Sequence, residues 1–347
     1  MADRHRVLNP DGKLADGAQP KLASEQVLDG LRWMLLSRAF DAKAVALQRQ
    51  GKIGTVSPVA GQEATVVGAA LALNPQTDWV VPSYRELPAL VRQGYPMERL
   101  FGSLLGKGLA SAIPEGVNVL PNQVAIATQL PHAAGLAWGL KLQGKEGVVM
   151  AFCGEGASSE GDFHEACNLA GVMKAPIVFL LQNNQWAIST GRNVQSAGDF
   201  YKRAAGYGFP GRCVDGNDLI AVYEVASEAV ERARKGEGPT LIESQTYRMS
   251  FHNTTDNPKA YLPEGWLEKA EKEDPVRRVE AYLAAQGLWD EATAAAVNSE
   301  IQEQVEGAVT TAMEMPVARP ENIFDHVYVT PPQRVIKQRE ELINRDA

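Results

Sequence analysis

The sequence predicts an α/β fold, built as one doubly wound, mostly parallel sheet with helical N- and C-terminal extensions. Two continuous apolar segments, 147–153 and 176–181, have the length and composition of strands that are buried on both faces. The segment between them, 162–173, has the periodicity of an amphipathic helix. Strand and helix patterns go on alternating over residues 79–245, which favours a single doubly wound domain.

Composition limits the classes of function. The chain has 347 residues, of which 45% are hydrophobic, enough for one large domain with extensions or for two domains. Its net charge of −8 gives no general attraction to nucleic acid or to an anionic membrane, so an anionic ligand needs a local site. Three cysteines in no zinc-binding pattern predict buried, reduced thiols, and no segment has the pattern of a secretory signal or a membrane span. We therefore expect a cytoplasmic protein.

The first elements follow from periodicity and turn residues. Residues 1–20 are rich in Gly, Pro and charge and predict a flexible arm. Apolar residues recur at near-helical spacing over 21–50, and Gly51 is a plausible stop. Residues 61–73 predict a second helix with small residues for close packing, followed by a short buried strand at 79–81.

The remaining elements complete the domain. Residues 101–123 predict a long functional loop, and residues 127–142 predict a helix of small residues. A long helix over 219–235 precedes a further strand at 239–245. The composition becomes charged and helical beyond residue 260. We expect three parts, namely an arm (1–20), an α/β domain (21–260) and a helical extension that packs on the domain and on partner subunits (261–347).

Polar residues follow two strands of the predicted sheet. Glu155 and Asn184 each come just after an apolar strand, and in a right-handed βαβ unit both would lie at the carboxyl edge where open α/β sheets bind ligands. A carboxylate and an amide oxygen suit Mg²⁺, which also binds phosphate oxygens. The N–H groups of Gly156 and Ala157 favour anionic oxygens there. A structural turn remains the alternative. A nicotinamide-binding Rossmann site is disfavoured, since the third glycine of its motif is displaced and no acidic residue follows the second strand.

Residues 154–162 (GEGASSEGD) and 182–189 (QNNQWAIS) resemble the thiamine diphosphate motif, and more narrowly the alpha subunits of the heterotetrameric 2-oxo acid dehydrogenases. The resemblance covers roughly residues 20–330, and further matching stretches are GQEA (61–64), YRE (84–86), TQLP (128–131), VDGND (214–218) and TYR (246–248) with His252. It implies the thiamine diphosphate-binding fold of the diphosphate-binding type.

The resemblance implies a ligand set for thiamine diphosphate and Mg²⁺. The side chains of Glu155 and Asn184 and the backbone carbonyl of Trp186 would bind Mg²⁺. Ile126 would prop the cofactor into its bent shape, and Gln182 would donate an uncharged hydrogen bond. The full set of implied cofactor-binding residues is Tyr84, Arg85, Ile126, Gly154, Glu155, Gly156, Ala157, Gln182, Asn184, Arg248 and His252.

His252 is the candidate catalytic residue. It lies in a polar loop with Arg248 and Asp256, just after a predicted strand, as expected of an active-site mouth. By resemblance it would contact the diphosphate and assist reductive acyl transfer, and a pKa near neutrality would suit that role.

The resemblance also implies partners. The glutamate that faces the cofactor's pyrimidine ring belongs to a beta subunit, so the chain would act only in a heterotetramer of two alpha and two beta subunits. The acyl group would pass to the lipoyl domain of an acyltransferase core. Residues 113–118 (IPEGVN) favour pyruvate, whereas Glu155 and residues 158–162 favour a branched-chain 2-oxo acid. Pyruvate is the favoured substrate, and acetoin dehydrogenase is a third alternative. A non-catalytic scaffold on a decayed thiamine fold is the remaining class, although Arg85, Glu155, Asn184 and His252 are all present.

Overall fold

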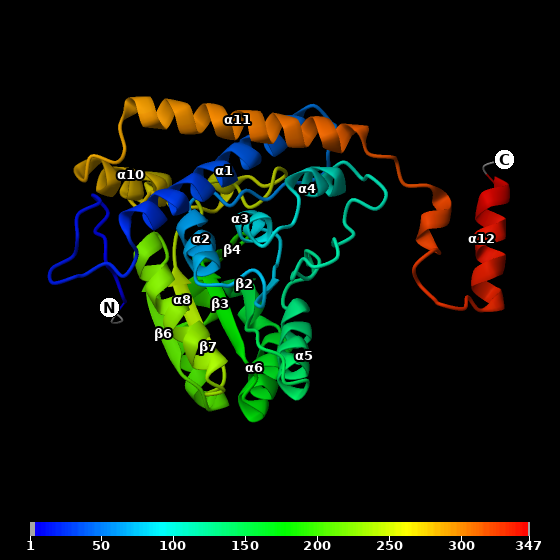
Figure 1. The fold of residues 1–347 in the computed structure, drawn as a ribbon, viewed down its shortest axis with the longest axis horizontal. Coiled ribbons are helices and arrows are strands. Elements are labelled where there is room, and N and C mark those ends of the chain that lie inside the picture. Colours follow the sequence, from blue (N-terminus) through cyan, green and yellow to red (C-terminus); the bar gives the residue numbers. More distant parts are fainter. Residues whose placement is uncertain (1–3, 346–347) are drawn as a thin grey trace.

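A five-stranded, all-parallel sheet forms the centre of the molecule (Figure 1). The computed structural model describes residues 4–345. The strand order across the sheet is β1 (Trp79–Val81), β2 (Val149–Gly154), β3 (Ile177–Asn183), β7 (Thr240–Gln245) and β6 (Gly211–Asp215). This sheet confirms the predicted fold class.

Helices cover both faces of the sheet, which explains why its strands are continuously apolar. In β2, Met150 and Phe152 enter one hydrophobic cluster, whereas Val149 and Ala151 enter the other. The first cluster includes residues of α1 (Ser24–Arg49), α2 (Glu63–Leu71) and α8 (Leu219–Arg234), and the second includes residues of α5 (Gln129–Leu142), α6 (Gly161–Met173) and the 3₁₀ helix η2 (Phe200–Tyr207). The core therefore has two halves, one on each side of the sheet.

Shorter elements surround the carboxyl edge of the sheet. They are α3 (Leu87–Arg92), α4 (Met97–Leu104), the 3₁₀ helix η1 (Glu155–Ser159), the hairpin of β4 (Trp186–Ala187) and β5 (Thr190–Gly191), and α7 (Arg192–Gln195). The predicted loop over 101–123 begins inside α4, and the rest of it contains no helix or named strand. The 3₁₀ helix η3 (Pro258–Ala260) and α9 (Trp266–Lys272) follow the last strand.

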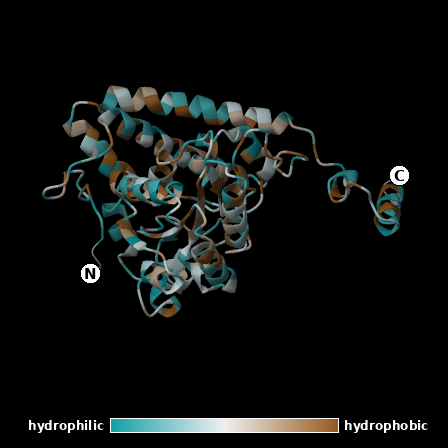
Figure 2. Ribbon diagram, turned by 60° about the horizontal axis from the view of Figure 1, so that its bottom comes forward, coloured by the Kyte–Doolittle hydropathy of each residue, from teal (hydrophilic) through white to brown (hydrophobic). Residues whose placement is uncertain are grey.

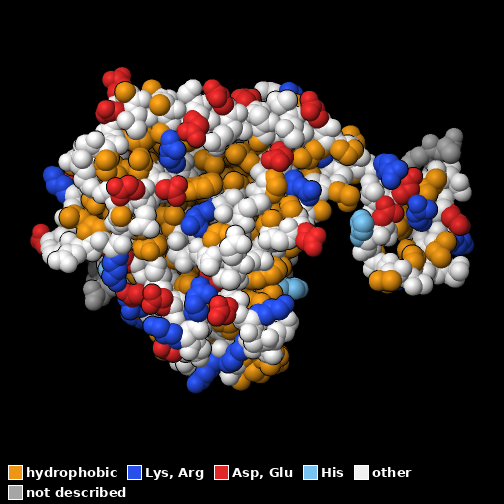
Figure 3. Space-filling model, in the orientation of Figure 1, with side chains coloured by type: hydrophobic (Ala, Val, Ile, Leu, Met, Phe, Trp, Pro, Cys, Tyr) orange, Lys and Arg blue, Asp and Glu red, His pale blue; other side chains and the backbone are white. Residues whose placement is uncertain are grey.

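The C-terminal extension divides into a packed part and a projecting part. After α10 (Pro275–Ala285), α11 (Glu291–Glu314) packs along α1 and α4. Its buried residues recur at helical spacing, as in Val297, Ile301 and Val305, and its ribbon alternates hydrophilic and hydrophobic residues in Figure 2. The 3₁₀ helix η4 (Pro320–Ile323) and α12 (Gln333–Arg345) stand away from the body in Figures 1 and 3.

Residues 4–20 lie against the domain, in contrast to the predicted flexible arm. His5 pairs with Val214 of β6, and Val7 and Leu8 are buried. The backbone N–H groups of Val7 and Leu8 both donate to Asp218 Oδ2, at 2.7 and 2.6 Å. The polar composition of the segment concealed this anchor, which rests on two apolar residues and one distant carboxylate.

Two other expectations can be compared directly with the structure. All three cysteines are buried and free, as predicted. Within residues 4–345, no helix is both long enough and apolar enough to cross a membrane.

Candidate active site

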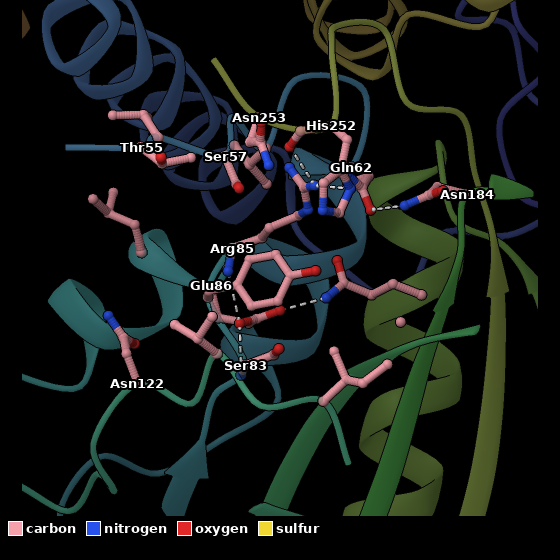
Figure 4. A pocket seen from close by; sticks show the side chains of 18 of the residues that line it. Thr55, Ser57, Gln62, Ser83, Arg85, Glu86, Asn122, Asn184, His252 and Asn253 are labelled. Atoms are coloured by element: carbon pink, nitrogen blue, oxygen red, sulfur yellow. Dashed lines mark hydrogen bonds between the residues drawn. The ribbon is translucent and has the colours of Figure 1, made fainter. Parts of the chain in front are cut away.

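A cavity of about 720 Å³ opens at the carboxyl edge of the sheet. Glu155 follows β2 and Asn184 follows β3, and these two strands are parallel neighbours with Gly154 paired to Gln182. The sheet therefore brings the two predicted metal ligands to one edge, as the βαβ argument requires. Figure 4 shows the cavity and the side chains that line it.

The structure gathers nearly all of the predicted site residues around this cavity. Tyr84, Arg85, Ile126, Gly154, Glu155, Gly156, Ala157, Gln182, Asn184, Trp186 and His252 all line it. Arg248 does not line the cavity, but it donates to the backbone oxygens of Trp186 and Ile188, which do. The predicted set is thus a single cluster in space, drawn from segments far apart in the sequence.

Two buried arginines of this cluster have no carboxylate partner among the described residues. Arg85 is 7% exposed, and it donates to the carbonyl oxygens of Pro58 and His252 and to Nδ1 of His252. Arg248 is 1% exposed, and it donates to the oxygens of Trp186 and Ile188 and to the Tyr261 hydroxyl. Burying a guanidinium without an opposite charge is costly, so two at one cavity indicate a site for a polyanion.

Buried polar atoms without hydrogen-bond partners point to the same ligand. Among the described residues, Glu155 Oε1, Gln182 Oε1 and Gln62 Nε2 have no partner, although all three residues are almost fully buried and line the cavity. Such atoms are normally paired in folded proteins. Burial raises the pKa of the Glu155 carboxyl to about 7, and a bound cation would lower it again. A carboxylate oxygen, an amide oxygen and two arginines fit a magnesium diphosphate.

Asn184 is held from both sides of its amide group. Its Oδ1 accepts from the backbone N–H of Trp186 at 3.1 Å, and its Nδ2 donates to Gln62 Oε1 at 3.1 Å. These two bonds fix which end of the amide is the oxygen. The carbonyl oxygen of Trp186, the predicted third metal ligand, accepts from Arg248 Nη1 at 3.2 Å.

Gln182 is bound to a buried carboxylate through the donor end of its amide. Its Nε2 donates to the buried carboxylate of Glu86 at 2.5 Å, so the unpaired atom is the acceptor Oε1. Glu86 also accepts from the backbone N–H groups of Ser83 and Arg85, at 2.9 and 3.0 Å. Because a carboxylate can only accept, it turns the donor end of Gln182 toward itself. One N–H of Gln182 is therefore bound to Glu86, and its second N–H stays available, so donation from Gln182 to the cofactor remains a prediction.

His252 does not have the near-neutral pKa that was expected. Burial, together with the nearby cations of Arg85 and Arg248, lowers the pKa of this imidazole to about 4. The backbone N–H of His252 donates to Asp256 Oδ2 at 2.7 Å, which anchors the loop. A diphosphate would reverse part of the effect, because its negative charge favours the imidazolium.

Strained backbone surrounds the cavity. Ala127, Gln185 and Ile188 have φ values of 69°, 73° and 55°, in the left-handed region that favours glycine. Ile188 is the most unusual, because it is β-branched, and its carbonyl is held by Arg248 at 3.0 Å. Ile126 precedes Ala127 and is 40% exposed at the cavity wall. Strain of this kind concentrates at functional sites.

Sequence reasoning gave no role to Gln62 or Glu86, although both lie in stretches that carried the resemblance. Each is 1% exposed and each lines the cavity. The sequence signal that could have identified these two residues is the GQE run at 61–63 and the YRE run at 84–86. Their contacts with Asn184 and Gln182 depend on segments roughly 100 residues away and could not be deduced from spacing.

Comparison with known proteins identifies the family of this chain. The family model described as dehydrogenase E1 component matches residues 31–321. The pyruvate dehydrogenase E1 component subunit alpha of Staphylococcus epidermidis is 37% identical over 338 residues, covering 96% of this chain and 91% of that protein. The proteins of the same name from Bacillus cereus and Bacillus subtilis are 36% and 37% identical over the same shares. The chain belongs to the dehydrogenase E1 component family.

Proposed function

We propose that this chain is the alpha subunit of a thiamine diphosphate- and Mg²⁺-dependent pyruvate dehydrogenase, which passes an acyl group reductively to the lipoyl group of an acyltransferase core. One observation carries the proposal. Two buried arginines have no carboxylate partner among the described residues: Arg85 lines the cavity and Arg248 lies just behind its wall, and the buried Glu155 Oε1 in the same cavity also lacks a partner. Positive charge for a diphosphate and a hard oxygen for a metal are therefore built into one place.

Mg²⁺ would be held by the oxygens of Glu155, Asn184 and the Trp186 carbonyl. Arg85 and Tyr84 would contact the diphosphate, with Arg248 behind them adding positive charge. Gly156 lets the chain pass close to the hairpin, since a Cβ at this position would lie 2.8 Å from Ala187 Cβ. When bound, the thiamine ring would supply carbanion stabilisation, the chemistry that no side chain provides.

The chain's own residues would position groups and move protons. His252 would handle a proton near the diphosphate, because its ring lies beside Arg85 on the cavity wall. The charge of the anion would raise the pKa of His252 from about 4 toward the working pH. Ile126 would support the bent cofactor, since its partly exposed side chain lines the same cavity.

The proposal includes a beta subunit and a lipoyl-bearing core. The described residues contain one doubly wound sheet, and it carries the diphosphate side of the site. The acid that faces the pyrimidine ring would come from the beta subunit, in a cytoplasmic heterotetramer of two alpha and two beta chains. The projecting part, which contains η4 and α12, exposes Ile323, Val327 and Val329, which is consistent with contacts to other subunits.

The relatives support pyruvate as the substrate, because those reported above carry pyruvate dehydrogenase in their names. A branched-chain 2-oxo acid is the second candidate, favoured by the glutamate at position 155. The test is turnover by the chain co-purified with its native partner, supplied with thiamine diphosphate, Mg²⁺ and an artificial electron acceptor. Preference for pyruvate over 3-methyl-2-oxobutanoate supports the proposal. The reverse preference replaces the substrate, and turnover of neither, with cofactor bound, redirects the search to acetoin.

A further inference from the structure

Gln62 occupies a place in the cavity that neither the family resemblance nor the proposed ligand set explains. It occupies the N-cap position of α2 without a side-chain capping bond, and it is 1% exposed. Figure 4 shows it between the Arg85–His252 pair and Asn184. Its two amide atoms have different surroundings. Oε1 accepts from Asn184 Nδ2 at 3.1 Å, whereas Nε2 has no hydrogen-bond partner among the described residues.

A purely structural glutamine would pair both ends of its amide. Leaving a buried N–H donor unpaired destabilises the fold, so its retention at a cavity indicates a partner that is part of the ligand. The acceptor for Gln62 Nε2 would be an anionic oxygen of the ligand. The positive charge of Arg85 on the same wall of the cavity favours negative charge there.

The backbone around Gln62 is fixed with unusual thoroughness. The carbonyl oxygen of Gly61 accepts from Thr246 Oγ1 at 2.6 Å and from Asn217 Nδ2 at 3.3 Å. The N–H of Gly61 donates to Glu63 Oε2 at 2.8 Å, and the N–H of Gln62 donates to the Val59 carbonyl at 2.8 Å. Gln62 is therefore presented to the cavity by a rigid support, as a preorganised binding group requires.

We infer that Gln62 is a positioning and binding residue of the magnesium diphosphate site, an inference that rests on the proposed function. Through Oε1 it holds the amide of Asn184 so that Oδ1 is the atom available to the metal. Through Nε2 it donates a hydrogen bond to an oxygen of the diphosphate. One side chain would thus contact both a metal-binding residue and the diphosphate.

The two halves of this role can be separated by substitution. Gln62→Met keeps the length of the side chain and removes both hydrogen bonds. Gln62→Glu keeps an acceptor for Asn184 Nδ2 but replaces the donor with a second acceptor that repels a diphosphate. Gln93→Met is the matched control, because Gln93 is a buried glutamine outside the cavity whose Nε2 donates to the Asp78 carbonyl.

The measurement uses the full chain co-purified with its partner subunit. Electron paramagnetic resonance of free Mn²⁺ gives the metal affinity in the presence of thiamine diphosphate, and calorimetry at saturating Mg²⁺ gives the affinity for thiamine diphosphate. Because partners of metal ligands typically contribute 10–100-fold to metal affinity, Gln62→Met should weaken Mn²⁺ binding by roughly that factor, and should weaken cofactor binding too. Gln62→Glu should retain more of the Mn²⁺ affinity than Gln62→Met and still lose cofactor affinity. Gln93→Met should leave both affinities unchanged.

Two other results are informative. If the unaltered chain binds Mn²⁺ with thiamine diphosphate and both Gln62 variants match Gln93→Met, the role of Gln62 is overturned while the proposed function stands. If the unaltered chain binds neither, the proposed function fails and this inference fails with it. Thermal unfolding of each variant separates lost binding from lost folding, and Gln62→Glu keeps the inference testable should Gln62→Met not fold.

Discussion

Arg85 Nη2 donates to both Nδ1 of His252, at 3.1 Å, and the carbonyl oxygen of His252, at 2.8 Å. A guanidinium can only donate, so Nδ1 is the acceptor and the ring proton resides on Nε2. Burial and this neighbouring cation keep the imidazole neutral, with a pKa of about 4. The two residues therefore form one unit, in which the charge of a bound anion alters the protonation of the histidine.

Arg85→Gln should weaken thiamine diphosphate binding. A hydrogen bond to a charged group contributes roughly 1.5–3 kcal/mol, which corresponds to about a 10–100-fold change in dissociation constant. Calorimetry on the co-purified complex measures it. Arg92→Gln is the control, because Arg92 donates to the Ala70 carbonyl at 2.7 Å outside the cavity. Equal affinities for the two variants would remove Arg85 from the diphosphate site.

His252→Ala should impair acyl transfer more than decarboxylation. A positioned acid or base contributes roughly 100-fold or more to a step that needs it, and acyl transfer to the lipoyl group is that step in our account. Decarboxylation is followed with an artificial electron acceptor, and transfer is followed by reductive acylation of an isolated lipoyl domain. Losses of the same size in both reactions would contradict the assignment.

Glu155→Gln should stabilise the metal-free protein at high pH. Burial raises the pKa of Glu155 from its ordinary 4.5 to about 7, so the folded state binds the proton more tightly than the unfolded state does. The contribution of Glu155 to the free energy of unfolding is therefore fully present below pH 4.5 and is lost as the pH rises through 7. Urea unfolding of both proteins without metal should show the variant more stable at pH 8 and unchanged at pH 4. A difference that does not grow with pH would argue against a buried, ionising carboxyl.

Gly61→Ala should destabilise the fold. The φ of Gly61 is 94°, and a Cβ there would lie 2.2 Å from the carbonyl oxygen of Tyr247. Because this oxygen belongs to the backbone, relieving the clash would require the main chain to shift. We expect a loss of about 2 kcal/mol or more in the free energy of unfolding. Gly54→Ala is the control, since nothing lies within 4 Å of its Cβ position and its φ is not in the left-handed region. Similar unfolding midpoints for the two variants would contradict the strained geometry at Gly61.

The sheet and the meeting of Glu155 with Asn184 were predictable from the sequence. Buried parallel strands are continuously apolar, and two parallel strands joined by a single helix usually lie side by side, so the carboxyl ends of β2 and β3 were expected to meet. The strand β6 was missed, because at the edge of the sheet its residues Gly211 and Arg212 remain accessible and break the apolar run. The packing of residues 4–20 was missed for a related reason, since only Val7 and Leu8 mark it.

Contacts between distant segments limited what could be predicted about the site. The carboxylate of Glu86 binds the donor end of the Gln182 amide and so leaves its oxygen facing the cavity. Burial and the cations of Arg85 and Arg248 lower the pKa of His252. Spacing along a single chain carries no information on which end of an amide faces a cavity. The residue types at the site were therefore predictable, whereas their orientation and electrostatics required the structure.

The most direct test of the central claim is Mg²⁺-dependent binding of thiamine diphosphate to the co-purified chain, measured by calorimetry with and without Mg²⁺ for the unaltered protein and for Glu155→Ala. We predict tight binding that requires Mg²⁺ in the unaltered protein and loss of the Mg²⁺-dependent part in the variant, because Glu155 supplies the buried oxygen for the metal. The same dissociation constant in both proteins, or binding indifferent to Mg²⁺, would contradict the account.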